Sequence, residues 1–281
     1  MNPTKTKKIL ITGGRGNIAQ IVVRHLSLAY NIFAPSRQEM NLLEPETIHS
    51  YFQQNGPFDI LLHTSIKGGR RTKEEDGQIT HDNLYMFENI IRYASQFELI
   101  INLDSAASYD RASDICARSE DDIRSVPADY YGFSKYVIYQ RTQNYENVVN
   151  FRIFNIVHEK EEPDRFISMC KNKKERNEPI TIFEDKYFDF FHENDFVRVF
   201  QYYADHFDPH DPTHFPKTLN IAYPEKLLLS EIAKTIVGPD LINILTKVSR
   251  DTKHYSGDGS LLHSLPIPGL STTSFLSYLN T

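Results

Sequence analysis

The stretch KILITGGRGNIAQIVVRHL, residues 8–26, decides the fold. Residues 8–12 form a short, mainly apolar run, which predicts a buried strand that the following glycines end. Apolar residues then recur with a helical period from Ile18 to Ala29. A strand, a glycine turn and a helix in this order are typical of the first βα unit of a parallel sheet.

The glycine turn has the spacing of a dinucleotide-binding loop. Gly14, Gly16 and Ala19 fit G-x-G-x-x-G/A directly after the strand and at the start of the helix. In such a turn, backbone N–H groups and the helix dipole can hold a pyrophosphate, whereas the alternative is a flexible turn without a ligand. The cofactor contacts that we predict here are Gly13, Gly14, Arg15, Gly16, Asn17 and Ile18.

The residues after the second predicted strand favour NADP(H) over NAD. An NAD site has an acidic residue about twenty positions further on, which binds the ribose 2′-hydroxyl. This chain has Ser36 and Arg37 there, and Arg15 can supply a second guanidinium. Charge-assisted contacts with a 2′-phosphate contribute about 1.5–3 kcal/mol each. The alternative is that both arginines are solvated surface residues.

Strands and helices continue to alternate after this unit. The patterns predict strands at 31–36, 58–65, 98–105 and 148–157, and helices at 44–55 and 80–96. Alternation of this kind predicts an α/β fold with a Rossmann-type doubly wound parallel sheet.

Regularity fades after residue 157, where charged and Pro-containing segments lead to a last predicted helix at 229–237. We therefore expect a dinucleotide-binding domain at 1–157. A smaller nucleotide-sugar-binding lobe at 158–281 would return some strands and helices to the first domain.

Composition excludes several classes of partner. The chain has 281 residues, 40% of them hydrophobic, so it can bury a full core. Its net charge is −6 without a long basic run, which argues against nucleic acid. No apolar run reaches 18 residues and no signal-peptide core is present, so we expect a soluble, cytoplasmic protein with no membrane partner. Cys116 and Cys170 lack metal or disulfide spacing and fit a reducing compartment.

The segment DHFDPHDPTHF, residues 205–215, places three histidines four positions apart among aspartates. That pattern invites a metal interpretation. Pro209 and Pro212 interrupt the helix that would align the imidazoles, so we expect a polar surface loop and no metal.

The segment DYYGFSK, residues 129–135, carries the candidate chemistry. Tyr131 and Lys135 are four positions apart and would share one helix face. Ser105 ends the strand predicted at 98–105, and the carboxyl ends of parallel strands line the ligand crevice. Ser105 and Tyr131 can therefore reach one carbonyl group, unless the Tyr–Lys pair only shares a helix face by coincidence.

Seven motifs occur in one order along nearly the whole chain: TGGRGNIA, FDILLHTS, Asn83 in THDN, SAASY, YGFSK, RIFN with Arg152 and Asn155, and FDFFHENDFV. On these motifs the chain resembles the nucleotide-sugar branch of the extended short-chain dehydrogenase/reductase family. The resemblance implies that Lys135 holds the nicotinamide ribose and that Ser105 donates a hydrogen bond to the substrate carbonyl. It also implies cofactor contacts at His63, Thr64, Ser65, Tyr131, Lys135 and Phe154.

The chemistry of reduction fits these residues. Hydride that reaches a ketone carbon builds negative charge on the oxygen, so the site needs a proton donor, which we assign to Tyr131. A free phenol has a pKa near 10, so proton transfer near pH 7 requires the pKa of Tyr131 to be lowered by about three units. We expect Lys135 and the cationic nicotinamide ring to provide it.

Within this family the chain is similar to the GDP-L-fucose synthase and dTDP-4-dehydrorhamnose reductase groups, through Arg15, SRQEMNLLE and SIKGG. That similarity implies NADPH and a nucleotide-diphosphate 4-keto sugar. Ala107 stands where the fucose synthase pattern has Cys, and Arg165 stands near its His. Since those two residues carry 3,5-epimerisation, we expect C4 ketoreduction without it.

Other features leave alternatives open. Phe188 replaces an Arg that clamps the substrate diphosphate, for which Lys171, Lys173, Lys174 or Arg176 would compensate unless they form a solvated helix face. Residues 67–76 form either an active-site flap or a solvated loop. We expect Asn83 and Asn155 to brace backbone.

Competing functions are a 4-epimerase, a dehydratase, and a non-catalytic NADP-binding regulatory subunit. Ala106 and Ala107 replace the Asp-Glu pair of dehydratases, and the retention of Ser105, Tyr131 and Lys135 argues against a non-catalytic protein. The resemblance also implies a homodimer through the helices at 85–95 and 131–145, with Tyr136, Val137 and Tyr139 in an apolar stripe.

Overall fold

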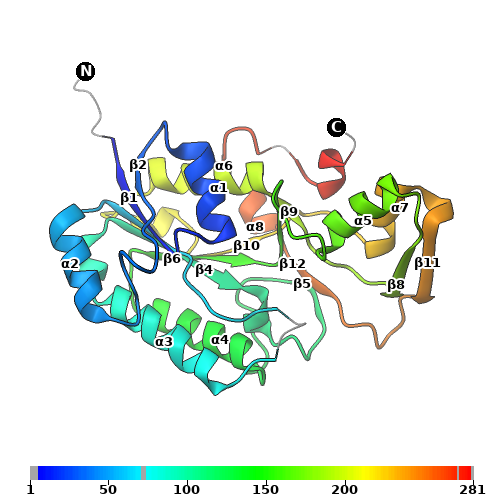
Figure 1. Cartoon of the computed structure of the whole chain (residues 1–281), viewed down its shortest axis with the longest axis horizontal. Coiled ribbons are helices and arrows are strands. Elements are labelled where there is room, and N and C mark those ends of the chain that lie inside the picture. The colour runs from blue at the N-terminus through cyan, green and yellow to red at the C-terminus, as the bar shows by residue number, and fades with distance from the viewer. Residues whose placement is uncertain (1–5, 71–73, 271, 280–281) are drawn as a thin grey trace.

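A six-stranded parallel sheet is the centre of the computed structural model, which describes residues 6–70, 74–270 and 272–279. The strand order is β10-β6-β4-β3-β1-β2, and each neighbouring pair is parallel (Figure 1). This confirms the predicted α/β fold with a Rossmann-type sheet. The strands are β1 (Lys8–Thr12), β2 (Asn31–Phe33), β3 (Ile60–His63), β4 (Leu99–Ser105), β6 (Val148–Ile153) and β10 (Thr218–Ile221).

Helices cover both faces of the sheet because its strands are apolar on both sides. Ile9 and Ile11 belong to one core cluster with residues of α1 and α6, whereas Leu10 belongs to another with α2 and α3. In Figure 1, α1 and α6 lie on one side of the sheet and α3 and α4 on the other. These helices are α1 (Asn17–Leu26), α2 (Pro45–Asn55), α3 (Gly77–Ile91), α4 (Tyr130–Thr142) and α6 (Glu193–His206).

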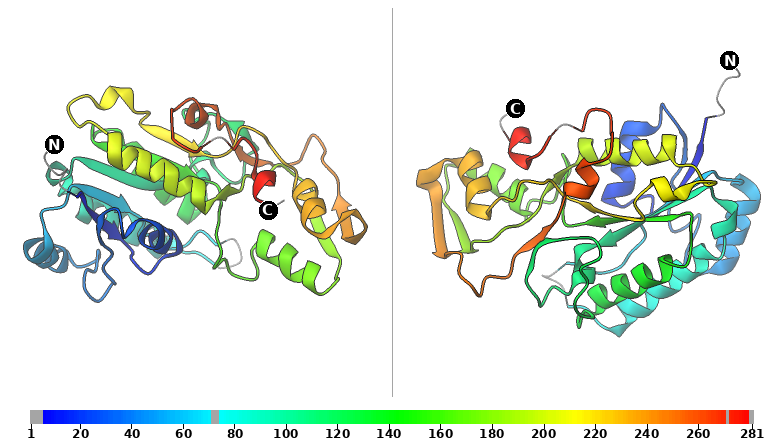
Figure 2. Two further views of the ribbon diagram at one scale, coloured as in Figure 1. Left: turned by 90° about the horizontal axis from the view of Figure 1, so that it is seen from above. Right: turned by 180° about the vertical axis from the view of Figure 1, so that it is seen from behind.

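A smaller lobe lies at the far end of the molecule from α2 (Figures 1 and 2). It packs α5 (Phe166–Glu175) and α7 (Leu229–Val237) beside a pair of parallel strands, β8 (Ile180–Glu184) and β11 (Ile242–Thr246). Between α5 and α7 the chain returns to the sheet to form α6 and β10. Strands from both sides of residue 157 build the central sheet, because β10 pairs with β6. A domain boundary at residue 157 stays our proposal.

The remaining elements are short. Their bounds are β5 (Ile115–Arg118), β7 (Ile156–Val157), β9 (Phe191–His192), β12 (Tyr255–Gly257) and α8 (Ser260–His263). The 3-10 helices cover Ala94–Gln96, Ala106–Tyr109, Pro212–His214, Pro239–Leu241 and Phe275–Tyr278.

Several predicted elements differ from the structure in their bounds, and two of the differences have a clear physical reason. The strand predicted at 148–157 splits, because β7 leaves the central sheet and pairs with β9, and the Asn155 carbonyl accepts a hydrogen bond from the Phe191 N–H at 2.9 Å. The helix predicted at 80–96 begins earlier, at Gly77, since the Asp76 side chain caps it by accepting from the Gln78 N–H. It also ends earlier, at Ile91, and Ala94–Gln96 form a separate 3-10 helix. The helix predicted at 229–237 has those bounds.

The part of the chain that the structure describes contains no helix that is both long and apolar enough to span a bilayer. Within the same ranges, no group of three His, Cys, Asp or Glu side chains is placed to bind a metal ion. His206 ends α6, while His214 lies in a 3-10 helix and pairs with Asp211 at 2.9 Å. The three histidines of residues 205–215 therefore do not share one helix.

Candidate active site

Two cavities lie along the carboxyl ends of the central strands. The first, of about 390 Å³, is lined by Ser105, Tyr131 and Lys135. The second, of about 760 Å³, lies over the glycine turn. Both are lined by Gly16, Thr64 and Ile66, so they are the two ends of one groove. We call the first cavity the inner end of the groove and the second cavity its outer end. An open α/β sheet binds its ligands in this position.

The glycine turn passes very close to the end of β2. A Cβ atom on Gly14 would lie 2.1 Å from the Ala34 carbonyl oxygen, so only glycine allows the two segments to approach this closely. Gly16 is the N-cap residue of α1, and it lines the groove together with Asn17 and Ile18. The start of α1 therefore faces the groove, which is the arrangement that holds a pyrophosphate.

The second cavity, at the outer end of the groove, contains charges of both signs. Arg15, Ser36 and Arg37 line the second cavity, and both arginines are exposed. The Glu39 carboxylate accepts a hydrogen bond from the Ser36 N–H at 2.8 Å, and this bond holds the pKa of Glu39 below its usual value. The sequence reasoning missed Glu39, because it looked for an acid only at the end of the strand.

Most of the other predicted cofactor residues line the groove. Thr64 and Ser65 lie at its middle, and Phe154 lies at its inner end. His63 is the exception, since its side chain lines neither cavity. It is buried against Phe87, with ring centroids 5.8 Å apart, and its Nδ1 lies 3.0 Å from the Thr12 hydroxyl. Burial, with the charge of Lys135, lowers the pKa of His63 to about 3, so this side chain is neutral.

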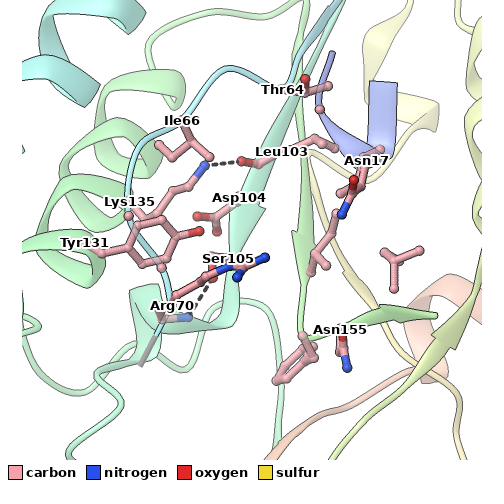
Figure 3. Close-up of a pocket in the computed structure, with 18 of the residues that line it drawn as sticks. Asn17, Thr64, Ile66, Arg70, Leu103, Asp104, Ser105, Tyr131, Lys135 and Asn155 are labelled. Atoms are coloured by element: carbon pink, nitrogen blue, oxygen red, sulfur yellow. Dashed lines mark hydrogen bonds between the residues drawn. The ribbon is translucent and has the colours of Figure 1, made fainter. Parts of the chain in front are cut away.

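The three candidate catalytic side chains come together at the end of β4 (Figure 3). Tyr131 lies in the first turn of α4, whose N-cap Asp129 accepts a hydrogen bond from the Gly132 N–H at 2.8 Å. Lys135 follows one turn later, and its Nζ donates to the Leu103 carbonyl at 2.6 Å and lies 6.0 Å from the centre of the Tyr131 ring. The Ser105 hydroxyl lies beside Tyr131 in the same cavity lining and accepts a hydrogen bond from the Ala107 N–H at 3.2 Å.

The protein itself keeps the Tyr131 phenol protonated. Burial raises the pKa of Tyr131, while the neighbouring Ser105 hydroxyl lowers it. Burial also lowers the pKa of Lys135 to about 8, and the nearby Asp104 carboxylate opposes that change. We expect Lys135 and the cationic nicotinamide ring together to lower the pKa of Tyr131, and this stays a prediction. In the chain by itself, burial outweighs the nearby charges and raises that pKa.

A buried ion pair next to Ser105 was not predicted. Asp104 precedes Ser105, and its side chain accepts from Arg152 Nε at 2.6 Å and from the Ser108 hydroxyl at 2.7 Å. Both charged side chains are fully buried. Arg152 lies opposite Asp104 in the register of β4 and β6. Only Arg152, in RIFN, belongs to a motif of the sequence. The register that pairs it with Asp104 belongs to the folded sheet, so the pair could not be predicted.

The outer wall of the first cavity joins the β3–α3 loop to the small lobe. Arg70 forms an ion pair with Glu162, and Glu162 also lies 3.8 Å from Arg165. These three residues and His158 line the cavity. Residues 71–73 of the predicted flap lie outside the described residues.

Asn83 braces this loop, as expected from the sequence. Its side chain accepts from the Lys67 N–H at 2.8 Å and donates to the Lys67 carbonyl and the Ser134 hydroxyl, both at 3.0 Å. The loop after β3 is therefore tied to both α3 and α4.

Phe188 packs among aromatic rings. Its ring centroid lies 5.1 Å from that of Phe190 and 5.2 Å from that of Tyr255. The basic side chains that we considered as substitutes for an Arg at this position lie on or next to α5, and none lines the two cavities; they are Lys171, Lys173, Lys174 and Arg176.

Comparison with known proteins gives a family match over residues 9–222, to the model described as the NAD dependent epimerase/dehydratase family. A GDP-L-fucose synthase of Azorhizobium caulinodans is 29% identical over 110 residues, which is 37% of this chain and 35% of that protein. The chain thus matches about a third of the length of this curated relative.

Solved structures share the fold over almost the whole chain. The Bordetella bronchiseptica enzyme WbmG, in complex with NAD and UDP, superimposes with a TM-score of 0.79 at 16% identity, covering 100% of this chain and 94% of that one. MlghC, a GDP-mannoheptose C4 reductase from Campylobacter jejuni with NADP bound, gives 0.73 at 19% identity, covering 93% and 92%.

Proposed function

The chain belongs to the NAD dependent epimerase/dehydratase family, and we propose that it is an NADPH-dependent reductase of a nucleotide-linked 4-keto-6-deoxy sugar. The observation that carries this proposal is the convergence of Ser105, Tyr131 and Lys135 at the inner end of a groove that begins at a dinucleotide-type glycine turn. Structural neighbours that bind NAD or NADP, among them a C4 reductase, support the same class.

The residues of the groove suit a dinucleotide. The open start of α1 would hold the pyrophosphate, and Ser36, Arg37 and Arg15 would hold a 2′-phosphate. Lys135 would hold the nicotinamide ribose. When bound, this cofactor supplies the hydride that reduces the ketone.

The chain's own side chains handle the oxygen and the proton. Ser105 and Tyr131 both donate hydrogen bonds to the carbonyl oxygen, and Tyr131 transfers its proton as negative charge develops there. The raised pKa of Tyr131 keeps this donor protonated before the reaction. The ammonium group of Lys135 stabilises the resulting phenolate, since it lies near the face of the same ring.

The inner cavity supports reduction without epimerisation. Ala107 is buried in its lining, where the fucose synthase pattern has Cys. Among the described residues that line this cavity, His158 is the one histidine, and burial lowers its pKa. The alternative 3,5-epimerase would exchange carbon-bound hydrogens of the sugar. Reaction in deuterium oxide should therefore leave C3 and C5 of the product without deuterium.

We also propose a cytoplasmic homodimer. Large apolar side chains on α3 and α4 are exposed, namely Tyr85, Tyr130 and Phe133. Tyr139, which we placed in the apolar stripe, is instead buried, with its ring centre 4.6 Å from the Arg152 guanidinium carbon. Light scattering at micromolar concentration checks this, and a monomer mass would contradict it.

Stoichiometric NADPH oxidation with a nucleotide-linked 4-keto sugar tests the function. A non-catalytic NADP-binding subunit would bind NADPH without turnover, and a 4-epimerase would interconvert sugars without net oxidation. A thermal-shift screen of GDP-, dTDP-, UDP- and CDP-sugars selects the nucleotide, because a ligand at 100 times its Kd adds about 2.7 kcal/mol of stability.

A further inference from the structure

Arg111 lies beside the catalytic tyrosine, although no motif marks it. It follows the 3-10 helix Ala106–Tyr109 and lines the inner cavity, with 14% of its side chain exposed. Its guanidinium carbon is 5.5 Å from the centre of the Tyr131 ring. Arginine over an aromatic face is an attractive arrangement, so Arg111 favours one orientation of this ring.

Arg111 is held by carboxylates from two different segments. It forms an ion pair with Asp129, to which its Nε also donates at 3.3 Å, and it lies 3.8 Å from Glu75. Asp129 is the N-cap residue of α4, the helix that carries Tyr131. Arg111 therefore fixes the start of that helix from outside it.

Glu75 extends the same contacts to the other side of the tyrosine. Its carboxylate accepts a hydrogen bond from the Gly69 N–H at 2.5 Å. A Cβ atom on Gly69 would lie 2.9 Å from Cζ of Tyr131, so the Gly69 backbone is packed directly against the ring. Gly69 has φ of +90°, which favours glycine here. Through Glu75, Arg111 thus also holds the backbone that supports Tyr131.

We propose that Arg111 is a positioning residue for Tyr131, which keeps the phenol in reach of Ser105 and stabilises the phenolate left after proton transfer. This inference rests on the proposed ketoreductase function. Because Asp129 and Glu75 already contact its guanidinium, Arg111 is not a free anion site for substrate.

The other charged or titratable groups around Tyr131 set the direction of the expected pH effect. Asp104 on β4 and Tyr255 on β12 raise the pKa of Tyr131, whereas Arg111 lowers it. The remaining groups are Lys135 on α4, Arg70 and Glu75 on the β3–α3 loop, and Asp129 at the cap of α4. Loss of Arg111 removes positive charge, so Tyr131 and the neighbouring Lys135, whose pKa burial lowers to about 8, must both deprotonate at higher pH.

The test compares Arg111→Gln with Arg111→Lys and a control, Arg124→Gln. Arg124 also pairs with an aspartate, Asp122, but it is exposed and lines neither cavity. In Arg111→Gln, kcat for keto-sugar reduction should fall about tenfold with little change in KM, and its alkaline limb should move up by about one pH unit. Arg111→Lys should keep the limb in place, since it keeps the charge, and Arg124→Gln should match the wild type.

A second measurement needs no substrate. Hydrogen exchange at the Gly69 and Gly132 amides should accelerate at least severalfold in Arg111→Gln, because both donate to carboxylates that Arg111 holds. Arg124→Gln should leave both unchanged.

The outcomes are separable. If the wild type reduces a keto sugar and Arg111→Gln leaves the alkaline limb in place, the inference is wrong, whatever the exchange shows. If the wild type oxidises no NADPH with any keto sugar, the proposed function fails, and the exchange at Gly69 and Gly132 alone decides the positioning role.

Discussion

The two ends of the groove are built in opposite ways. At the outer end, a backbone turn and exposed side chains such as Arg15 and Arg37 form the wall. At the inner end, buried side chains form it, with Lys135 donating to the Leu103 carbonyl and Asp104 paired with Arg152. Exposed charges interact weakly through water, whereas buried charges interact strongly. Substitutions at the inner end should therefore change activity far more than those at the outer end.

The largest effect should come from Tyr131→Phe, which removes the proton donor and keeps the ring. Folding and NADPH binding should survive, while kcat falls about 10²–10⁴-fold, because general acid catalysis contributes that much. Single-turnover NADPH absorbance with a keto sugar measures this step. Tyr130→Phe is the matched control, since Tyr130 is exposed and has no Lys four residues later. A Tyr131→Phe enzyme within about threefold of the wild type would refute the assigned mechanism.

A smaller, directional effect on kcat should follow Asp104→Asn, measured well below the lowered melting temperature that the loss of this buried pair causes. The Asp104 charge raises the pKa of both Lys135 and Tyr131. Its loss should make both groups deprotonate at lower pH, so the alkaline limb of kcat should move down by about one unit. This is opposite in sign to Arg111→Gln, and a double mutant should fall between the two. An upward shift in Asp104→Asn would contradict the electrostatic account of the inner end.

At the outer end, Arg37→Ala should remove most of the cofactor preference. We expect the wild type to bind NADPH at least tenfold tighter than NADH, a difference of about 1.4 kcal/mol. Calorimetric titration of both cofactors tests this, with the exposed Arg176→Ala as a control for the loss of surface charge. Equal affinities in the wild type would show that the two exposed arginines are only surface residues.

The smallest effect should come from Glu39→Gln. Its carboxylate lies at the Ser36 N–H, close to where a 2′-phosphate would bind, and it is exposed. An exposed charge is strongly screened by water, so removing it should have a small effect, with NADPH binding about threefold tighter and NADH about equally. If Glu39 instead binds a ribose hydroxyl, NADH affinity should fall in Glu39→Gln.

The same contrast explains what the sequence could predict. The outer end depends on local pattern, since a strand, a glycine turn and a helix follow one another within residues 8–26, and the structure has these elements there. That Ser105, Tyr131 and Lys135 line one cavity was predictable, because each lies at a fixed place in a motif. Contacts made across the fold were not, since Arg111 meets Glu75 and Asp129 from segments 36 and 18 residues away.

Electrostatic consequences were the least predictable part. The sequence placed Lys135 beside Tyr131, but the direction of the Tyr131 pKa depends on how deeply both side chains are buried. Burial is a property of the packed molecule, to which β12, late in the chain, contributes Tyr255. The division of the strand predicted at 148–157 into β6 and β7 also depends on a distant segment, because β7 pairs with β9.

The Asp104–Arg152 pair has a consequence for how this protein can vary. A change at either position alone leaves a buried charge without its partner, which costs about 3–5 kcal/mol, a large fraction of a domain's stability. Replacing both by well-packed apolar residues can instead be neutral. The two positions should therefore change together or stay as they are, and random mutagenesis of single sites should find few tolerated substitutions at either one. Variation beside Ser105 thus needs paired steps, whereas the exposed arginines at the outer end can change one at a time without a comparable loss of stability.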